Sequence, residues 1–207
     1  MNEKTLFKIS YGLYVLSTRL GDEDNGCIIN TAIQAASKPN QISICVNKLN
    51  HTHDMIMRTG AFTVSSITEK ADFSLFKRFG FQSGKETNKF DGFDGWLRGI
   101  NGVPYITESC NAYISVKVEK TVDLGSHTLF IGQVTDMEVL SEDPSVTYAY
   151  YQSNIKPKPE KVGTTPKGET VWRCIICGYE YVGEELPEDF ICPWCKHPAS
   201  DFEKIVR

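Results

Sequence analysis

Short segments in which hydrophobic and polar residues alternate make up most of the first 140 residues of the chain. They are rich in Val, Ile, Thr and aromatic residues, and a period of two places one face of such a strand against a core. The dipeptides Asn25-Gly26 and Gly125-Ser126 between them are typical of hairpin turns. The predicted strands cover residues 13–20, 27–36, 41–48, 62–67, 112–122 and 128–140.

Two short helices are predicted among these strands. Residues 53–59 form the first, with Thr52 as its N-cap and Gly60 as its C-terminal stop. Residues 71–79 form the second, which Gly80 ends. Many strands with few, short helices predict a mainly β fold, an antiparallel barrel with small helical insertions.

The composition changes after residue 154, where lysines and prolines alternate from Lys156 to Pro159. Such a segment is an extended, semi-stiff linker. We therefore expect a domain over 1–155, a linker over 156–169 and a small domain over 170–207. A chain of 207 residues has room for one ordinary domain and one small one.

Two Cys-x-x-Cys pairs dominate the small domain, Cys174 with Cys177 and Cys192 with Cys195, separated by 14 residues (192 − 177 − 1). This spacing predicts a tetrahedral site of four thiolates for one metal ion, either structural zinc or redox-active iron. A dry apolar shell tunes an iron centre, and aromatic residues are frequent in this segment, which favours iron. The aromatic residues are Trp172, Tyr179, Tyr181, Phe190, Trp194 and Phe202.

The small domain resembles rubredoxin through CIICGYEY (174–181), Leu186-Pro187, CPWC (192–195) and DFE (201–203). The stretch between the cysteine pairs is short, as in the rubredoxin domains of rubrerythrins, and Lys196 stands where Gly usually follows the last cysteine. The resemblance implies one iron held by four thiolates, which passes one electron at a time.

An anion site is predicted where the strand over 41–48 gives way to a helix. Free backbone N–H groups at a helix start, together with Lys48 and nearby polar side chains, suit a phosphate group. From this segment alone, an ordinary capped helix is the alternative interpretation.

The larger domain resembles the flavin reductase-like, FMN-binding split-barrel family over about residues 5–155. The resemblance rests on the order and spacing of GLYVLST (12–18), Asn25-Gly26, NTAIQAASKP (30–39), ICVNKLNHTH (44–53), FGFQSGKETNKF (79–90) and GSHTLFIGQV (125–134). It implies a homodimer that binds FMN and is reduced by NAD(P)H. Ser126 stands where the family usually has Asp.

The resemblance also implies the residues of the flavin site. His127 would lie near the nicotinamide or the flavin edge as the catalytic candidate, with a turn residue as the alternative role. The residues implied to bind the cofactor are Asn30, Thr31, Ala32, Ala36 and Ser37 along the flavin, Asn47, Lys48, Asn50, His51 and Thr52 at the phosphate, and Ser83, Lys85 and Lys89 closing over it.

Together the two domains indicate a protein that passes electrons from NAD(P)H, directly or through a separate reductase, through FMN to the iron centre. The resemblance suggests a flavodiiron oxygen or nitric oxide reductase as acceptor, and acidic residues of the small domain suggest a docking patch for a basic partner. One alternative is a flavin reductase that releases reduced FMN and carries a structural zinc tail. Another is an FMN-binding or stress-sensing module without enzymatic activity.

Composition and charge agree with a redox protein and exclude other classes. A net charge of −4 argues against a nucleic-acid partner, and no apolar run reaches membrane-spanning length. Lys8 and Gly12 interrupt the first apolar stretch, so no signal peptide is expected. The other cysteines, Cys27, Cys45 and Cys110, are isolated and are predicted to be small buried strand residues in a cytoplasmic protein.

Overall fold

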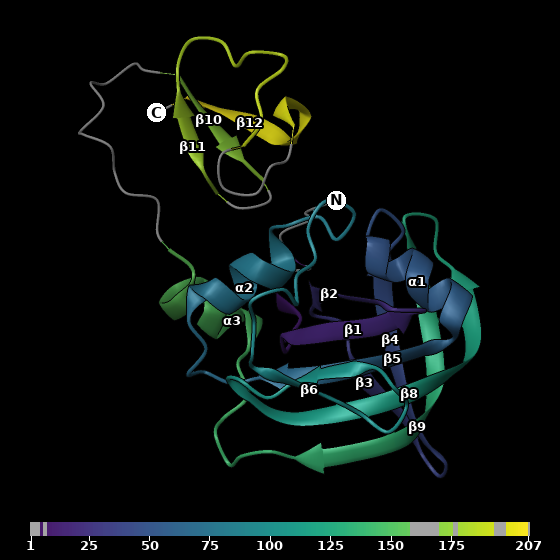
Figure 1. The fold of residues 1–207 in the computed structure, drawn as a ribbon. Coiled ribbons are helices and arrows are strands. Elements are labelled where there is room, and N and C mark those ends of the chain that lie inside the picture. The colour runs from purple at the N-terminus through teal and green to yellow at the C-terminus, as the bar shows by residue number, and fades with distance from the viewer. Residues whose placement is uncertain (1–4, 6–7, 158–169, 176–177, 193–197, 207) are drawn as a thin grey trace. The chain divides into compact units, whose positions relative to one another are not determined.

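The computed structural model describes residues 5, 8–157, 170–175, 178–192 and 198–206 (Figure 1). It contains two compact units, Met1–Lys156 and Pro157–Arg207. The predicted linker over 156–169 lies almost wholly outside the described residues. Within the part of the chain that is described, no helix has the length and apolar character needed to cross a membrane.

The first unit contains nine strands and a few short helices. Its strands are β1 (Tyr14–Leu20), β2 (Glu23–Ile29), β3 (Ile33–Ser37), β4 (Asn40–Asn47), β5 (Ala61–Ile67), β6 (Trp96–Arg98), β7 (Pro104–Ile106), β8 (Cys110–Asp123) and β9 (His127–Val139). Its helices are α1 (His51–Thr59), α2 (Phe73–Gly80), α3 (Tyr148–Tyr150) and a π-helical turn, η2 (Tyr151–Ile155).

Seven of the strands form one antiparallel sheet in the order β2-β1-β5-β8-β9-β4-β3. The long strands β8 and β9 form a hairpin within this sheet and curve strongly, as Figure 1 shows. The strands β2 and β3 follow each other in the chain but form the two edges of the sheet. The sheet is thus a barrel that is split between them, and the predicted mainly β split-barrel fold is confirmed.

The interior of the barrel is one hydrophobic core to which most of the sheet and α1 contribute. Phe62 on β5 and Phe130 on β9 are completely buried there, and Ile56 of α1 covers the core. Close strand contact requires Gly132 on β9, since a Cβ there would lie 2.5 Å from both Lys117 O and Val116 Cγ1. The core residues are Leu16, Cys27, Ile29, Ile42, Ile44, Val46, Ile56, Phe62, Val64, Val116 and Phe130.

A second core lies between the sheet and helix α2. Phe76 and Phe79 of this amphipathic helix pack with Leu13 and Val15, and Phe79 also contacts Phe90 edge-to-face at 5.5 Å. The sequence between α2 and β6 is therefore held on the sheet by aromatic side chains.

Predicted and observed strands differ at β2 and β3, and at β6 and β7, which were not predicted. The predicted strand 27–36 is wrong, because this segment forms two strands separated by residues 30–32. The predicted turn at Asn25-Gly26 is also wrong, because these residues lie inside β2, opposite Thr18 and Ser17. The hairpin instead turns at Gly21, whose φ of 61° suits glycine.

The helix ends differ from the prediction in two places. Helix α1 begins at His51 with Asn50 as N-cap, so the prediction of Thr52 as N-cap is wrong, whereas Gly60 ends the helix as predicted. Helix α2 begins at Phe73, where the Asp72 side chain accepts a hydrogen bond from the Ser74 N–H. Gly80 is its last helical residue.

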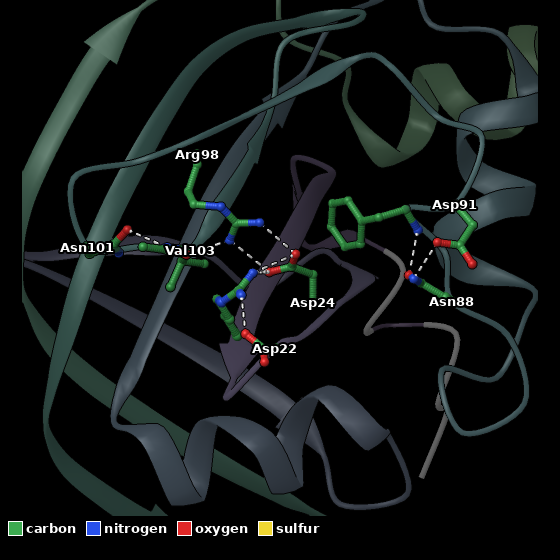
Figure 2. A network of polar contacts seen from close by, with 10 residues as sticks. Asp22, Asp24, Asn88, Asp91, Arg98, Asn101 and Val103 are labelled. Carbon is green, nitrogen blue, oxygen red and sulfur yellow. Dashed lines mark hydrogen bonds and ion pairs between the residues drawn. The ribbon is translucent and has the colours of Figure 1, made fainter.

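A polar network joins the β6–β7 hairpin to the β1–β2 hairpin (Figure 2). Arg98 on β6 and Arg19 on β1 both bind the carboxylate of Asp24, at 2.8–3.0 Å and 3.0–3.1 Å respectively. Arg98 also donates to Gly102 O at 2.7 Å. Because these partners are up to 74 residues apart in the chain, the sequence patterns did not reveal them.

The second unit contains a three-stranded antiparallel sheet in the order β11-β10-β12. Phe190 lies among Tyr179, Tyr181 and Phe202, with ring centroids 4.9–6.4 Å apart. The elements are β10 (Thr170–Cys174), β11 (Glu180–Val182), β12 (Phe202–Val206) and the 3₁₀ turn η3 (Ala199–Asp201).

Candidate functional site

The start of helix α1 offers uncapped hydrogen-bond donors. Asn50, the N-cap residue, has extended backbone angles but makes no side-chain hydrogen bond to the helix. Its amide Nδ2 instead lies 3.9 Å from Cys27 Sγ. Among the described residues, no side chain caps the N–H groups of His51 and Thr52 in the first helical turn, and an anion could accept from them.

Lys48, two residues before the N-cap, connects this helix start to the tip of the β8–β9 hairpin. Its backbone N–H donates to Ser126 O at 3.0 Å, and its Nζ donates to both carboxylate oxygens of Asp123 at 2.7 and 2.8 Å. The hydrogen bond from Lys48, followed by one from the Gly125 N–H, lowers the pKa of the Asp123 carboxyl. Both charged side chains are accessible to solvent, with exposed fractions of 36% and 73%.

The catalytic candidate His127 lies directly opposite Asn47 in the β4–β9 ladder. Its Nδ1 is 2.9 Å from Ser126 Oγ. The candidates at 47–52 and His127 are therefore brought together. His53 was not among the predicted site residues. It is buried, and its Nε2 lies 2.9 Å from Oγ1 of Thr128, the residue after His127. Only the folded structure reveals this contact.

The candidates along the predicted flavin fall into two groups. Thr31 lies beside β4, since its hydroxyl donates to Cys45 O at 2.8 Å and accepts from the Cys45 N–H at 3.1 Å. Ala36 and Ser37 pair instead with Gln41 and Asn40 at the opposite end of β4. Six residue steps lie between Gln41 and Asn47, about 20 Å along the strand. Asn30, Thr31 and Ala32 are thus close to the helix start, whereas Ala36 and Ser37 are not.

The candidates after α2 differ in their environment. Ser83 and Lys85 are exposed, whereas only 4% of Lys89 is exposed. The ammonium of Lys89 donates to Gly26 O at 2.8 Å and Phe79 O at 3.1 Å, and burial lowers its pKa. Lys89 therefore anchors edge strand β2 to the end of helix α2.

Beside Lys89, the segment after α2 also contacts Asn25 of β2. A Cβ at Gly84 would lie 2.4 Å from Asn25 Oδ1, so the chain approaches this amide closely. Asn25 Nδ2 is buried and has no hydrogen-bond acceptor among the described residues. The start of α1 and the nearby amine of Lys48 form a donor set that fits a polar, phosphorylated cofactor such as FMN. Asn25 Nδ2 is a further unused donor, on strand β2.

The two described cysteines of the predicted metal site are both completely buried. Cys174 ends β10, and the Gly178 N–H donates to Cys174 O at 2.8 Å in a tight turn where Gly178 has a φ of 81°. Such a turn suits a Cys-x-x-Cys metal site. Cys177 and Cys195 lie outside the described residues, so the four-thiolate site stays a prediction.

The comparisons with known proteins identify both units. The Flavin reductase like domain family matches residues 6–158, and the Rubrerythrin, rubredoxin-like domain family matches residues 172–203. The chain thus belongs to the flavin reductase-like family and is a flavin-dependent oxidoreductase with a rubredoxin-like domain. Within this class it belongs to the high molecular weight rubredoxins. It is 35% identical to the high molecular weight rubredoxin of Moorella thermoacetica, with 99% of this chain and 100% of the relative covered.

Two further similarities extend over most of the chain. A ferric-chelate reductase (NAD(P)H) of Archaeoglobus fulgidus is 40% identical, over 83% of this chain and 98% of the relative. The structure of an NADH:FAD oxidoreductase from Streptomyces globisporus C-1027 superposes with a TM-score of 0.64 at 20% identity. The superposition covers 77% of this chain and 92% of the Streptomyces chain. At 20% identity, this similarity supports only the assignment of the fold.

Proposed function

We propose that the protein carries electrons from NAD(P)H through FMN to one iron ion at Cys174, Cys177, Cys192 and Cys195, and then to a redox protein. The observation that carries this proposal is the presence, in one chain, of a flavin reductase-like unit whose helix start and Lys48 would suit a phosphate, and of a rubredoxin-like unit with buried cysteines. FMN supplies the chemistry that links a two-electron hydride donor to a one-electron iron acceptor.

The residues of the first unit would bind and orient the cofactor. The N–H groups of His51 and Thr52 and the amine of Lys48 would hold the phosphate, and Asn47 and Asn50 would flank it. His127 would orient the nicotinamide or the flavin edge beside them. The remaining candidate contacts are Asn30, Thr31, Ala32, Ala36 and Ser37 with the ring system, and Ser83 and Lys85 above it.

The contacts described above change the proposed roles of two candidates, Thr31 and Lys89. The hydroxyl of Thr31 is already hydrogen-bonded to Cys45, so Thr31 would contact the cofactor through its backbone. Lys89 would support the site by holding Gly26, because its ammonium already donates to two backbone carbonyls.

The surroundings of the cysteines favour iron over zinc in this proposal. Aromatic rings cluster at Phe190, and Cys174 and Cys192 are both completely buried, so the metal would have a dry environment that sets its potential. Zinc in the same thiolates would give a structural domain that carries no electrons.

The acceptor would be a redox protein with a basic rim, of the flavodiiron reductase class. Glu184, Glu185, Glu188 and Asp189 are exposed on the second unit. Glu180, by contrast, is bonded to Arg173 at 2.9 and 3.2 Å and contributes less free charge. Electrostatic docking of this kind mainly raises the association rate and weakens with salt.

The flavin reductase-like unit would be a homodimer. The ladder pairings place Ile33, Ile131, Cys45, Leu129 and Val122 on the outer face of β3, β4, β9 and β8. Ile33 is 65% and Val122 45% exposed, so this face, called here the outer β face, carries apolar side chains. An apolar patch of this kind indicates a contact surface.

The proposal is tested by a visible absorption spectrum with metal analysis, before and after anaerobic addition of NADH or NADPH. We expect flavin and iron–thiolate bands that both bleach, and electron delivery to a basic redox acceptor that slows as salt is added. The variant Cys192→Ser should retain flavin and its reduction but lose delivery, because the iron site is incomplete.

The control is Cys45→Ser, which changes a cysteine outside the predicted metal site. Delivery that persists unchanged in Cys192→Ser, or stoichiometric zinc with flavin bands alone, would contradict the electron route. Bands that are present but do not bleach would mean that a separate reductase supplies the electrons.

A second candidate function is favoured by the similarity to the ferric-chelate reductase, since this chain aligns with 98% of the length of that protein. In this case the first unit would reduce soluble acceptors, such as ferric chelates or free flavin, without the iron centre. Reduction of ferric chelates at an undiminished rate by Cys192→Ser would support this activity.

A further inference from the structure

The Lys48–Asp123 ion pair places an acidic side chain inside the proposed phosphate site. Asp123 is the last residue of β8, and its carboxylate makes two short contacts with the Lys48 ammonium. The Gly125 N–H, at 2.7 Å from Asp123 Oδ1, orients the carboxylate toward Lys48. The backbone bond from the Lys48 N–H to Ser126 O fixes the two segments side by side independently of this ion pair.

We propose that Asp123 is an internal counter-ion that competes with the cofactor phosphate for Lys48 and thereby lowers the affinity for FMN. This inference rests on the proposed function, in which Lys48 binds the phosphate. A phosphate at the start of α1 would carry up to two negative charges and would share one ammonium with the Asp123 carboxylate. Repulsion between the Asp123 carboxylate and the phosphate opposes FMN binding. Because both side chains are exposed, solvent and salt screen this repulsion and keep its effect moderate.

The same contact weakens the preference of the site for FMN over riboflavin. Riboflavin lacks the phosphate and does not need the ammonium, so the Lys48–Asp123 pair does not oppose its binding. The pair therefore reduces the advantage of FMN over riboflavin. With Asp123 present, the affinity for FMN is lower than it would be if Lys48 had no carboxylate partner. The ion pair also keeps the Lys48 side chain in place when no phosphate is bound.

The test uses the full-length protein, depleted of flavin, and measures the dissociation constants of FMN and riboflavin by flavin fluorescence quenching. Asp123→Asn preserves the shape and an oxygen acceptor for the Gly125 N–H but removes the charge. We expect it to bind FMN about 1.5- to 5-fold more tightly and riboflavin unchanged. Glu119→Gln is the matched control, because it removes an equal charge from the same strand, where Glu119 binds Gln41 rather than Lys48.

The Lys48→Ala variant separates this inference from the proposed function. We expect it to weaken FMN relative to riboflavin, and in this background Asp123→Asn should lose most of its gain. If Lys48→Ala leaves the ratio of the two affinities unchanged, the proposed phosphate site and this inference are both wrong. If Lys48→Ala weakens FMN but Asp123→Asn does not tighten it, or tightens riboflavin equally, only the counter-ion role is overturned.

Discussion

Cys110 begins strand β8 with 4% of its surface exposed and belongs to the core between the sheet and helix α2. Burial, followed by the nearby charge of Glu108, raises the pKa of the Cys110 thiol to about 12. Burial also raises the pKa of Cys27. Both thiols therefore stay protonated at neutral pH and act as small core residues, which confirms the expectation for these two. The same expectation was wrong for Cys45, which is only partly buried because it lies on the outer side of β4.

The raised pKa of Cys110 gives stability a definite pH dependence. The folded state retains this proton above pH 9, where the unfolded chain releases it, so the stabilisation is complete below pH 9 and is lost as pH rises toward 12. Cys110→Ala should lower the free energy of unfolding at pH 8 but flatten its decline at higher pH, by up to about 1.4 kcal/mol per pH unit.

Urea denaturation at a series of pH values between 8 and 10.5, followed by far-UV circular dichroism, measures this difference. Cys27 is present in both proteins, so its own titration cancels in the comparison. Equal slopes for Cys110→Ala and the parent protein would show that Cys110 does not retain its proton in the folded state.

At the residue scale, the sequence indicated where polar groups gather but not which of them are already bonded. Lys89 was predicted to close over the cofactor, yet its partner Gly26 is 63 residues distant in the chain. The bonds of Thr31 to Cys45 and of Lys48 to Asp123 join residues that are 14 and 75 positions apart. Such partners depend on strand register and tertiary packing, which single motifs do not encode.

At the element scale, the outer β face consists of residues that alternate with those of the barrel core. Leu129 lies opposite both Cys45 on β4 and Val122 on β8, at the centre of this face. A lysine at this position would place a charge inside the proposed dimer contact, where leaving it unpaired is costly. Leu129→Lys should therefore convert the dimer to a monomer in sedimentation velocity, with the flavin reductase-like fold retained.

Met137→Lys is the matched control, since Met137 is exposed on the same strand and faces Ile114 rather than the outer β face. It adds the same charge and should leave the dimer intact. A parent protein that sediments as a monomer, or a dimer that withstands Leu129→Lys, would exclude the outer β face as the contact surface.

The elements themselves were largely predictable, because a period of two identifies each long strand that has one buried face. Asn25-Gly26 misled the prediction because Gly26 serves packing rather than a turn: a Cβ there would lie 3.0 Å from Leu16 O and 3.3 Å from the Phe79 ring. The strands β6 and β7, with three residues each, were missed because they are too short for alternation to register.

At the scale of the whole molecule, the order of the two units could be predicted because each carries motifs that are local in sequence. The spacing of the two cysteine pairs is such a motif, because it is read from residues that are close together in the chain. The proposed flavin site was predicted only as a region, because its candidate residues come from β4, α1, the β8–β9 hairpin and the segment after α2. Residues 47–52 and His127 come together only in the folded barrel.

The division into two compact units predicts that the tether between them sets the rate of internal electron transfer. A short tether holds a second site at an effective concentration of about 1 mM. Transfer from reduced flavin to iron in the intact chain should therefore be independent of protein concentration. If the chain is cleaved at a protease site introduced at Gly163, both cofactors should stay bound, but transfer should become bimolecular. At about 10 µM of each part it should be on the order of 100-fold slower.

Stopped-flow absorbance at several protein concentrations distinguishes these regimes, with the uncleaved protease-site variant as control. A cleaved protein that transfers electrons at the same concentration-independent rate would mean that the two units stay associated through their own surfaces. An interface between the units, rather than the tether, would then determine the rate of electron transfer. In that case a charge change on the interface would slow transfer, whereas cleavage of the tether would not.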